Sequence, residues 1–316
     1  LRSLQSAGNS GEFYTPRAVT DFMVQMIKPK LGEYIADFAC GTGGFLTSAL
    51  KVLDAQVQTV EDRTVYSNSI YGIEKKALPF LLCATNMLLH DIDNPRIIHG
   101  NSLEKNVREY KESDRFDVIL MNPPYGGNEK EGVKQNFPAD LRSSETADLF
   151  MSVIMYRLKQ NGRCAIILHT VIRMPHSVFA PYTSITTNIL FFDRTHPTTE
   201  TWFYRLDMPE GYKNFSKTKP MKLEHFAPTV EWWDNREEIT IDGFDKAKKY
   251  TVEELKARSY NIDLCGYPHE EEEILPPKEL IQQYQEKRAS LNADIDRILA
   301  QITDILGIDI TEEGDE

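Results

Sequence analysis

One stretch, residues 34–53, most constrains how this chain can fold. It contains a short apolar strand (34–38), a turn with Gly41, Gly43 and Gly44, and a helix from Leu46. Strand, glycine turn and helix in succession open a doubly wound α/β sheet that binds a nucleotide at its carboxyl edge. Leu46 stands where a dinucleotide fingerprint has its third glycine. The turn therefore favours a mononucleoside such as S-adenosylmethionine over a nicotinamide dinucleotide.

Three further predicted strands also end in polar residues. The strand at 69–73 ends at Glu74, the strand at 96–99 is followed by Asn101, and the strand at 116–121 ends at Asn122. Because parallel strands present their carboxyl ends at one edge of a sheet, we expect these side chains to lie close together. Glu74 is then placed to accept ribose hydroxyls, and Asn101 to bond an adenine edge.

Apolar periodicity predicts the remaining elements of a catalytic domain at residues 1–204: helices at 18–27, 75–89 and 147–158, and strands at 163–168 and 186–193. The helix at 75–89 is expected to turn one apolar side toward the sheet, with Leu78, Leu81, Leu82, Thr85 and Leu88 or Leu89. The polar segment 126–146 suits either phosphate contacts or a solvated loop, with Lys130, Lys134 and Arg142.

The strand at 116–121 leads into Asn122-Pro123-Pro124-Tyr125. Each proline fixes its own φ and keeps the preceding residue extended, so this loop is rigid. The Asn122 side-chain oxygen and the Pro123 carbonyl are acceptors that can converge on one amino group. Tyr125 adds a ring for a base rotated out of its duplex. Accepting both N–H groups localises the lone pair of an aromatic amine and stabilises the charge that develops during methylation. The same tetrapeptide also suits an ordinary turn.

The segment at residues 11–17 precedes the first helix, with Thr15 and Pro16 as its predicted N-cap and first-turn pair. A helix N-terminus flanked by aromatic residues suits an anionic or adenine-bearing ligand, although this segment taken alone favours an ordinary capped helix.

Charge is unevenly distributed along the 316 residues, whose formal net charge is −12. Residues 205–316 hold 15 Lys and Arg against 26 Asp and Glu, a net of −11, so residues 1–204 are close to neutral. Neither part has the excess of positive charge typical of a protein that binds DNA alone, so for a nucleic-acid substrate we expect a partner chain to supply much of the affinity.

The four cysteines are scattered without a CxxC pair, which argues against zinc or a disulfide framework and favours a reducing cytoplasm. No apolar stretch approaches the roughly 20 residues of a membrane span. We therefore expect a cytoplasmic protein that holds no metal.

The region after residue 204 is expected to be acidic and irregular as far as about Pro277. A helix at about 278–306 follows, with apolar residues at alternating steps of three and four and one polar break at Arg288. Such a stripe either packs back on the domain or pairs with a helix of another chain, and we favour the partner chain.

In this order, the motifs resemble those of the modification subunit of type I restriction–modification systems. The resemblance covers essentially the whole chain and is carried by residues 12–16, 37–45, Glu74, Asn101, 122–125, 178–183, 187–192 and the C-terminal helix. It implies adenine-N6 methylation of double-stranded DNA with S-adenosylmethionine. It also implies a complex with a restriction subunit and a specificity subunit, in which two modification subunits serve each specificity subunit and the C-terminal helix docks on the latter.

The resemblance also implies roles for single residues. Asn122, Pro123, Pro124 and Tyr125 would hold and stack the adenine, and Phe179 is a weaker candidate for the second face of the base. The cofactor would be bound by Glu12, Phe13, Tyr14, Thr15, Pro16, Arg17, Asp37, Gly41, Thr42, Gly43, Gly44, Glu74 and Asn101.

The chain departs from the family pattern in two places. Only residues 1–10 precede the Phe-Tyr-Thr-Pro motif, where the family carries a helical domain. A family loop and helix are also absent between Leu168 and His169. We expect either that the sequence omits segments of a longer protein or that the chain is a shortened form.

Three other classes of protein remain as alternatives. A protein-glutamine methyltransferase also uses an Asn-Pro-Pro-Tyr loop, but it should lack the Phe-Tyr-Thr-Pro element and the heptad tail. A non-catalytic assembly subunit would keep the heptads and lose Asn122 or the glycine turn. Leu46 disfavours a nicotinamide dehydrogenase.

Overall fold

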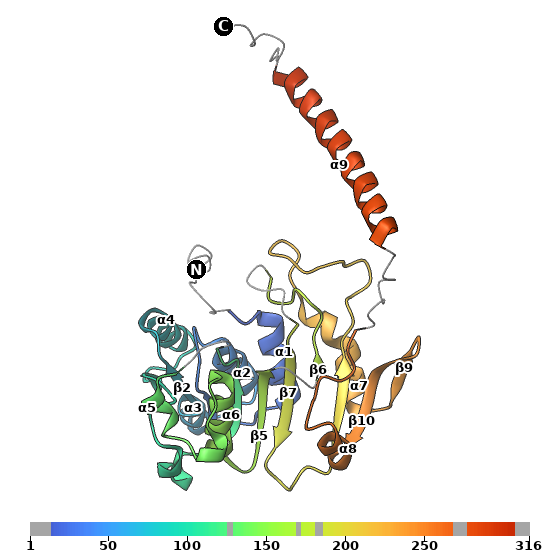
Figure 1. Ribbon diagram of the computed structural model, residues 1–316. Helices are drawn as coiled ribbons and strands as arrows, with labels where there is room; N and C mark the ends of the chain where they lie inside the picture. Colours follow the sequence, from blue (N-terminus) through green and yellow to red (C-terminus); the bar gives the residue numbers. More distant parts are fainter. Residues whose placement is uncertain (1–13, 125–128, 169–171, 181–185, 268–276, 307–316) are drawn as a thin grey trace. The chain divides into compact units, whose positions relative to one another are not determined.

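The computed structural model describes residues 14–124, 129–168, 172–180, 186–267 and 277–306 (Figure 1). The chain divides into two compact units, Leu1–Tyr267 and Pro268–Glu316. Glu12, Phe13 and Tyr125, which the sequence places in the site, lie outside the described residues.

A ten-stranded sheet runs through the first unit in the order β3-β2-β1-β4-β5-β7-β6-β8-β10-β9. Strands β1 to β5 are mutually parallel, β7 runs antiparallel between β5 and β6, and β8 is parallel to β6. The predicted doubly wound α/β class is therefore confirmed. The strands are β1 (Ile35–Asp37), β2 (Ile70–Glu74), β3 (Ile97–His99), β4 (Phe116–Met121), β5 (Leu158–Leu168), β6 (Ile172–Arg173), β7 (Asn188–Asp193), β8 (Glu200–Arg205), β9 (Ile239–Ile241) and β10 (Phe244–Thr251).

Helices cover both faces of the sheet. Along β4, Val118 and Leu120 point into a core formed with α1 and α2, whereas Ile119 and Met121 point into a second core formed with α6. Both sets are fully buried, as expected of a central parallel strand. The described α-helices are α1 (Arg17–Ile27), α2 (Gly44–Asp54), α3 (Val60–Ser67), α4 (Ala77–Leu88), α5 (Glu131–Lys134), α6 (Thr146–Arg157), α7 (Ala227–Asp234), α8 (Val252–Ala257) and α9 (Pro277–Leu306).

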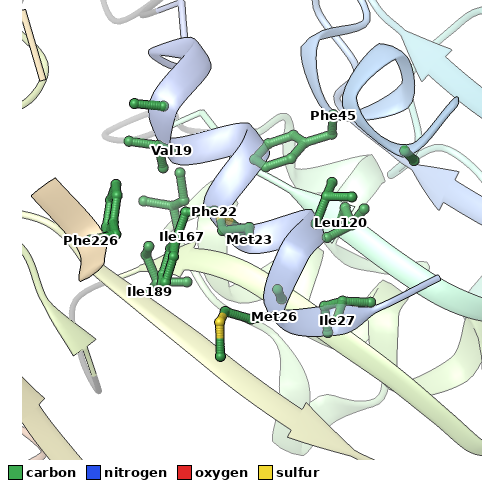
Figure 2. Close-up of a cluster of buried hydrophobic side chains, with 14 of the residues drawn as sticks. Val19, Phe22, Met23, Met26, Ile27, Phe45, Leu120, Ile167, Ile189 and Phe226 are labelled. Atoms are coloured by element: carbon green, nitrogen blue, oxygen red, sulfur yellow. The ribbon is translucent and has the colours of Figure 1, made fainter. Parts of the chain in front are cut away.

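Helix α1 lies on the sheet through an apolar face that is almost completely buried (Figure 2). Phe22 stands at its centre, with its ring stacked on Phe226 at a centroid distance of 4.0 Å and edge-on to Phe191. Burial of a Phe side chain contributes about 1.5–3 kcal/mol. This packing joins the first helix to the chain more than 200 residues later, so α1 belongs to the sheet and not to a separate N-terminal element.

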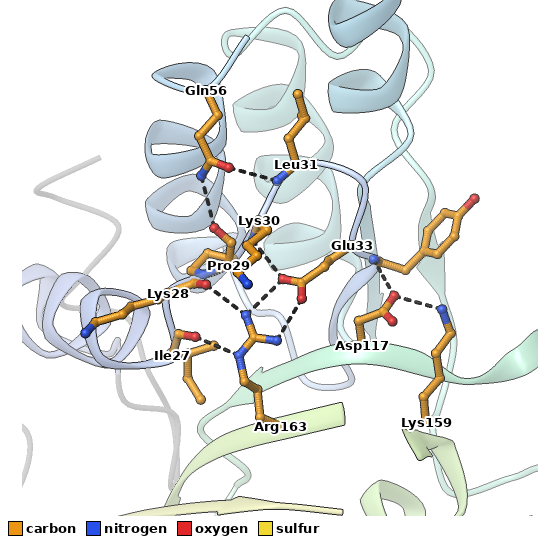
Figure 3. Close-up of polar contacts among 11 residues, drawn as sticks. Ile27, Lys28, Pro29, Lys30, Leu31, Glu33, Gln56, Asp117, Lys159 and Arg163 are labelled. Carbon is orange, nitrogen blue, oxygen red and sulfur yellow. Dashed lines mark hydrogen bonds and ion pairs between the residues drawn. The ribbon is translucent and has the colours of Figure 1, made fainter. Parts of the chain in front are cut away.

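The end of α1 is held by Arg163 of β5 (Figure 3). Its guanidinium donates to the carbonyls of Ile27 and Lys28 at 2.7 and 2.8 Å. It also forms two bonds with the Glu33 carboxylate, at 2.8 and 2.9 Å. Lys28 is in the left-handed conformation that ends the helix. One planar side chain thus satisfies helix-end carbonyls and a carboxylate together.

The sheet does not end near residue 204, where the sequence analysis closes the catalytic domain. Strands β8 to β10 extend the same sheet, and the compact unit runs to Tyr267. The expectation of an irregular region is therefore wrong between residues 205 and 267. The short, charged strands β9 and β10 alternate too weakly to stand out in sequence, because no residue of β9 is buried and only one residue of β10 is.

Helix α4 presents a different face to the sheet from the one predicted. Its buried residues are Cys83 and Met87, whereas Leu78, Leu81 and Leu88 are more than half exposed. The contact side must approach the glycine turn closely, and small or flexible side chains do this better than leucines. Periodicity alone selects the most apolar face and cannot detect this requirement.

Candidate functional site

Hydrogen bonds join the carboxyl ends of β1, β2 and β3 at one edge of the sheet, and β4 ends at the same edge because it is parallel to β1. The Cys40 N–H donates to the Ile73 carbonyl, and the Gly100 N–H donates to the Glu74 carbonyl, both at 3.0 Å. The Ser102 hydroxyl donates to the Phe38 carbonyl at 2.6 Å. Glu74 and Asn101 therefore lie at connected strand ends, and Asn122 follows β4 at the same edge.

The glycine turn after β1 requires its glycines. Gly41 and Gly43 have φ of +53° and +84°, where a side chain is strained. A Cβ on Gly43 would also lie 2.9 Å from the Cys83 sulfur and 3.0 Å from the Met87 methyl group, whereas a Cβ on Gly41 would meet no atom within 4 Å. The turn is thus packed on the α4 side and open beside Gly41, which lets a ligand approach the backbone.

Glu74 joins the second strand to this turn. Its carboxylate accepts the Gly41 N–H and the Lys76 N–H, each at 2.8 Å. Thr42 is fixed separately, because its carbonyl accepts from the Asn86 side chain at 2.8 Å. A carboxylate oxygen can accept two bonds, so Glu74 retains acceptor capacity for the hydroxyls predicted for it.

Asp37 ends β1 beneath the turn and is only 1% exposed. Burial raises the pKa of its carboxyl to about 8, the Ala39 N–H opposes this shift, and repulsion from Glu74 adds to it. The Ala39 N–H lies 3.1 Å from the carboxylate. A carboxyl held protonated near neutral pH becomes ionised most readily when a cation arrives beside it.

The third strand adds a cluster that the sequence analysis did not anticipate. The Asn101 side chain accepts from the Leu103 N–H at 3.1 Å and donates to Glu129 at 3.5 Å. Glu129 in turn pairs with Lys75 at 2.8 Å, and its side chain is only 11% exposed. Glu129 lies in the polar segment 126–146, and nothing in the local pattern distinguishes it from its neighbours.

Asn122 is the residue whose surroundings are most informative. Its amide nitrogen donates to the Thr15 hydroxyl at 3.1 Å, across 107 residues of chain. Its amide oxygen is buried and has no hydrogen-bond partner within the described part of the chain. Pro123 is buried and Pro124 is exposed. A rigid loop therefore holds an unsatisfied acceptor, an arrangement that is costly unless a donor occupies it.

The segment before α1 differs from its predicted capping role. Pro16, not Thr15, is the N-cap, and it makes no side-chain capping bond. Thr15 turns its hydroxyl to Asn122 instead. Arg17 donates to the Gly44 carbonyl at 3.0 Å and to the Thr47 hydroxyl at 2.6 Å, so it joins α1 to α2. Tyr14, which precedes Thr15 in the sequence, is half-buried.

The ring of Phe179 is buried and is not presented to the site. It is 2% exposed and belongs to the core that includes Phe22 and Phe226. In this structure its ring has no free face for a base. Hydrophobic periodicity could not predict the burial of Phe179, because residues 174–180 form neither a helix nor a strand.

The described residues offer neither a metal centre nor a membrane span. No group of three potential ligands among His, Cys, Asp and Glu gathers in the described ranges. None of the helices in those ranges is both long enough and apolar enough to cross a bilayer.

The fold and the site together define a Rossmann-like methyltransferase domain. The sequence profile of the N-6 DNA methylase family matches residues 2–170 and 167–274. These two stretches meet where the sequence analysis finds a family loop and helix to be absent.

Individual proteins similar to this chain identify a subgroup of this family. The methylase subunit of the Escherichia coli type I restriction enzyme EcoEI is 46% identical, over 97% of this chain and 67% of that protein. A crystal structure of a modification subunit assigned to a type I restriction enzyme of Vibrio vulnificus is 44% identical and has a TM-score of 0.73, over 80% of this chain and 58% of that one. A chain from a structural study of type I restriction–modification assembly is 34% identical, with a TM-score of 0.75, over 99% of this chain and 69% of that one.

This chain belongs to the N-6 DNA methylase family, among the methylase subunits of type I restriction enzymes. It spans about half to two thirds of the length of curated relatives that it matches, 67% of the EcoEI subunit and 55% of a Mycoplasma pneumoniae subunit.

The buried carboxyl gives a testable pH dependence. The folded chain keeps the Asp37 proton until about pH 8, whereas the unfolded chain releases it near the ordinary value of 3.8. The stabilising contribution of this carboxyl is complete below pH 3.8 and is lost as the pH rises to about 8. We expect Asp37→Asn to remove this loss. The difference in free energy of unfolding between Asp37→Asn and the wild type should therefore shift in favour of the variant by roughly 2–4 kcal/mol from pH 5 to pH 8.

Urea denaturation of the ligand-free chain at both pH values measures the difference. Asp54→Asn on the exposed end of α2 is the matched control. Parallel stability profiles for wild type and Asp37→Asn would show that Asp37 titrates like a surface carboxyl.

Proposed function

We propose that this chain is the modification subunit of a type I restriction–modification complex and methylates adenine N6 in DNA, with S-adenosylmethionine as methyl donor. The observation that carries the proposal is the buried oxygen of Asn122, which has no partner in the described structure while its amide nitrogen is occupied by Thr15. Family membership supports the same reaction.

The residues of the turn fit the cofactor. The open side of Gly41, the acceptor capacity of Glu74 and the side chain of Asn101 suit a nucleoside, and the buried Asp37 carboxyl suits a nearby cation. When bound, S-adenosylmethionine supplies an electrophilic methyl group on a cationic sulfur. Glu12 to Arg17, Thr42, Gly43 and Gly44 complete the proposed binding set.

Asn122 and the Pro123 carbonyl would orient the attacking amine. Each accepts one N–H of the adenine amino group, which localises the nitrogen lone pair and lowers the energy of the transition state as nitrogen becomes positive. Tyr125 would stack on the base after it leaves the duplex. No general base is required before transfer, because the proton is lost only after nitrogen has become cationic.

The proposed reaction is tested by nucleoside mass spectrometry. DNA from cells that express the full gene with its specificity gene should contain N6-methyladenine. Asn122→Ala should lower the methylation rate at least 100-fold, since it removes an acceptor that acts in the transition state.

Retained S-adenosylmethionine binding in Asn122→Ala is the control for folding. Wild-type levels of methyladenine in this variant would remove Asn122 from the mechanism. Absence of methyladenine with the wild type, despite cofactor binding, would redirect the proposal to an amide nitrogen in a protein.

Thr15 has a positioning role in this proposal. Its hydroxyl is the acceptor for the Asn122 amide nitrogen, so it restricts rotation of the amide and holds the oxygen toward the substrate. We expect Thr15→Val to lower kcat roughly tenfold, equivalent to about 1.4 kcal/mol, whereas Thr15→Ser retains the hydroxyl and most of the rate.

The KM for S-adenosylmethionine separates two roles for Thr15. A positioning role lowers kcat and leaves this KM within about threefold. A tenfold higher KM with unchanged kcat would assign Thr15 to the cofactor alone, as the resemblance first implied.

The specificity subunit is the proposed partner of α9. The helix covers the predicted range, and its apolar stripe is exposed, with Ile281, Tyr284, Leu291, Ile295, Ile298, Ile302 and Ile305 each at least 46% accessible. A structure of type I assembly contains a chain 34% identical to this one. We further propose that two modification subunits join each specificity subunit, together with a restriction subunit, in the cytoplasm.

Charge substitutions on the two sides of α9 test this docking. Ile295→Glu with Ile298→Glu places carboxylates in the stripe, and should weaken co-purification with the specificity subunit at least 100-fold, because two buried isoleucines contribute about 3–6 kcal/mol. Ala293→Glu with Ala300→Glu, on the opposite side, adds the same charge and should leave assembly intact. Equal effects of the two pairs would exclude the stripe as the interface.

A further inference from the structure

A lysine-rich loop lies on the same sheet edge as the proposed active site. Strand β8 is parallel to β6, β6 and β5 are both antiparallel to β7, and β5 is parallel to β4. The carboxyl end of β8 therefore points to the edge where Asn122 follows β4. The chain leaves β8 at this edge, and in Figure 1 the yellow-to-orange loop after β8 rises at the end of the sheet where α1 begins.

The charge of this loop is opposite to that of its surroundings. We define the lysine loop as residues 211–223, which contain no Asp or Glu. It is a basic stretch within a C-terminal region, residues 205–316, whose net charge is −11. Its lysines are all exposed: Lys213, Lys217, Lys219 and Lys222.

The lysine loop has a fixed conformation. Phe215 and Met221 are buried at 3% and 5% exposure and anchor it in the core of the sheet domain. Between them, Ser216 and Lys219 exchange backbone hydrogen bonds at 3.0 and 3.2 Å. This tight turn presents Lys217 at its tip, so the loop carries its positive charge on an ordered support.

The loop is also tied to the segment that leaves β6. The Phe215 N–H donates to the Ser177 hydroxyl at 2.9 Å, and the His176 ring bonds to the Asn214 side chain at 2.8 Å. The Leu206 N–H donates to the Arg173 carbonyl at 2.9 Å. Both segments therefore emerge side by side at the carboxyl edge.

Within the described residues, three of the four lysines have no anionic partner, and Lys222 alone forms an ion pair. Lys219 lies 3.6 Å from the centroid of the Tyr212 ring, and Lys222 pairs with Glu224 at 3.3 Å. Within the described part of the chain, Lys213 and Lys217 make no ion pair. Their charges are thus available to an external anion.

Two of the three cations in the basic segment selected from the sequence, Lys134 and Arg142, are less available. Lys134 pairs with Glu131 at 3.4 Å, and the Arg142 guanidinium donates to the Phe137 carbonyl at 3.1 Å. The structure therefore favours the lysine loop over these two cations as a phosphate contact.

We propose that the lysine loop binds the phosphate backbone of the DNA duplex beside the methylated adenine. The proposal rests on the proposed function. Strand β8 is the fourth strand from β4 in the sheet order, a separation of roughly 19 Å at about 4.8 Å per strand. At about 3.4 Å per base pair this corresponds to about six base pairs. The loop thus contacts duplex that flanks the extruded base, and its lysines add affinity without reading sequence.

Lys213→Gln with Lys217→Gln tests the proposal in the full complex with the specificity subunit. Affinity for a duplex with the recognition site is measured by fluorescence anisotropy across a range of salt concentrations. We expect Kd to rise about tenfold or more at low salt, and the slope of log affinity against log salt to become shallower by one to two, because each lost lysine–phosphate contact removes about 0.9.

The matched control is Lys30→Gln with Lys51→Gln, which removes two exposed lysines after α1 and in the last turn of α2, at the opposite edge of the sheet. It makes the same change in net charge and should leave the salt slope unchanged. Both pairs should retain thermal stability and cofactor affinity. A duplex without the recognition site should lose affinity to the same extent with the loop variant.

The possible outcomes distinguish phosphate binding by the lysine loop from the proposed methylation activity. Unchanged affinity and salt slope in the loop variant, with an active wild type, would overturn the inference alone. Loss of subunit assembly with normal DNA binding by the assembled fraction would also overturn it, and would assign the loop to an acidic protein surface. A wild-type complex that does not methylate DNA would overturn the proposed function itself.

Discussion

The position of helix α1 is the constraint on which the proposed active site depends. Arg163 holds one end of the helix through the carbonyls of Ile27 and Lys28, and the stacked ring of Phe22 holds its middle. The other end then carries Thr15 to the amide of Asn122. A shift of one helical turn, about 5.4 Å, would break that bond, so interactions at the far end of α1 help to fix the orientation of a residue at the catalytic edge.

The sequence predicts this fold well where a signal is local. Strand, glycine turn and helix are adjacent in the chain, and the polar residue after each strand is read directly. Glu74, Asn101 and Asn122 therefore fall where they were expected, next to the turn or at the same edge. The C-terminal helix is found for the same reason, because its heptad pattern is a property of one continuous segment.

Contacts between residues far apart in the sequence could not be predicted in this way. The bond between Thr15 and Asn122 spans 107 residues, and Thr15 satisfies the local rule for an N-cap equally well. The burial of Phe179 and the exposure of the α4 leucines depend on what packs against each side chain. Glu129 lies near Asn101 only because its loop returns to the third strand. In each case a tertiary contact selected one of several locally acceptable arrangements.

An acidic chain can still bind DNA if its positive groups are local and unpaired. The Debye length at physiological salt is about 8 Å, so acidic residues beyond that distance weaken a lysine–phosphate contact only slightly. What matters for Lys213 and Lys217 is the absence of carboxylates within the lysine loop, rather than the net charge of −12 for the whole chain. The same reasoning accounts for the partner chain in the proposed function: a few phosphate contacts would provide orientation at the target base, whereas the affinity for one DNA site would come from a larger surface.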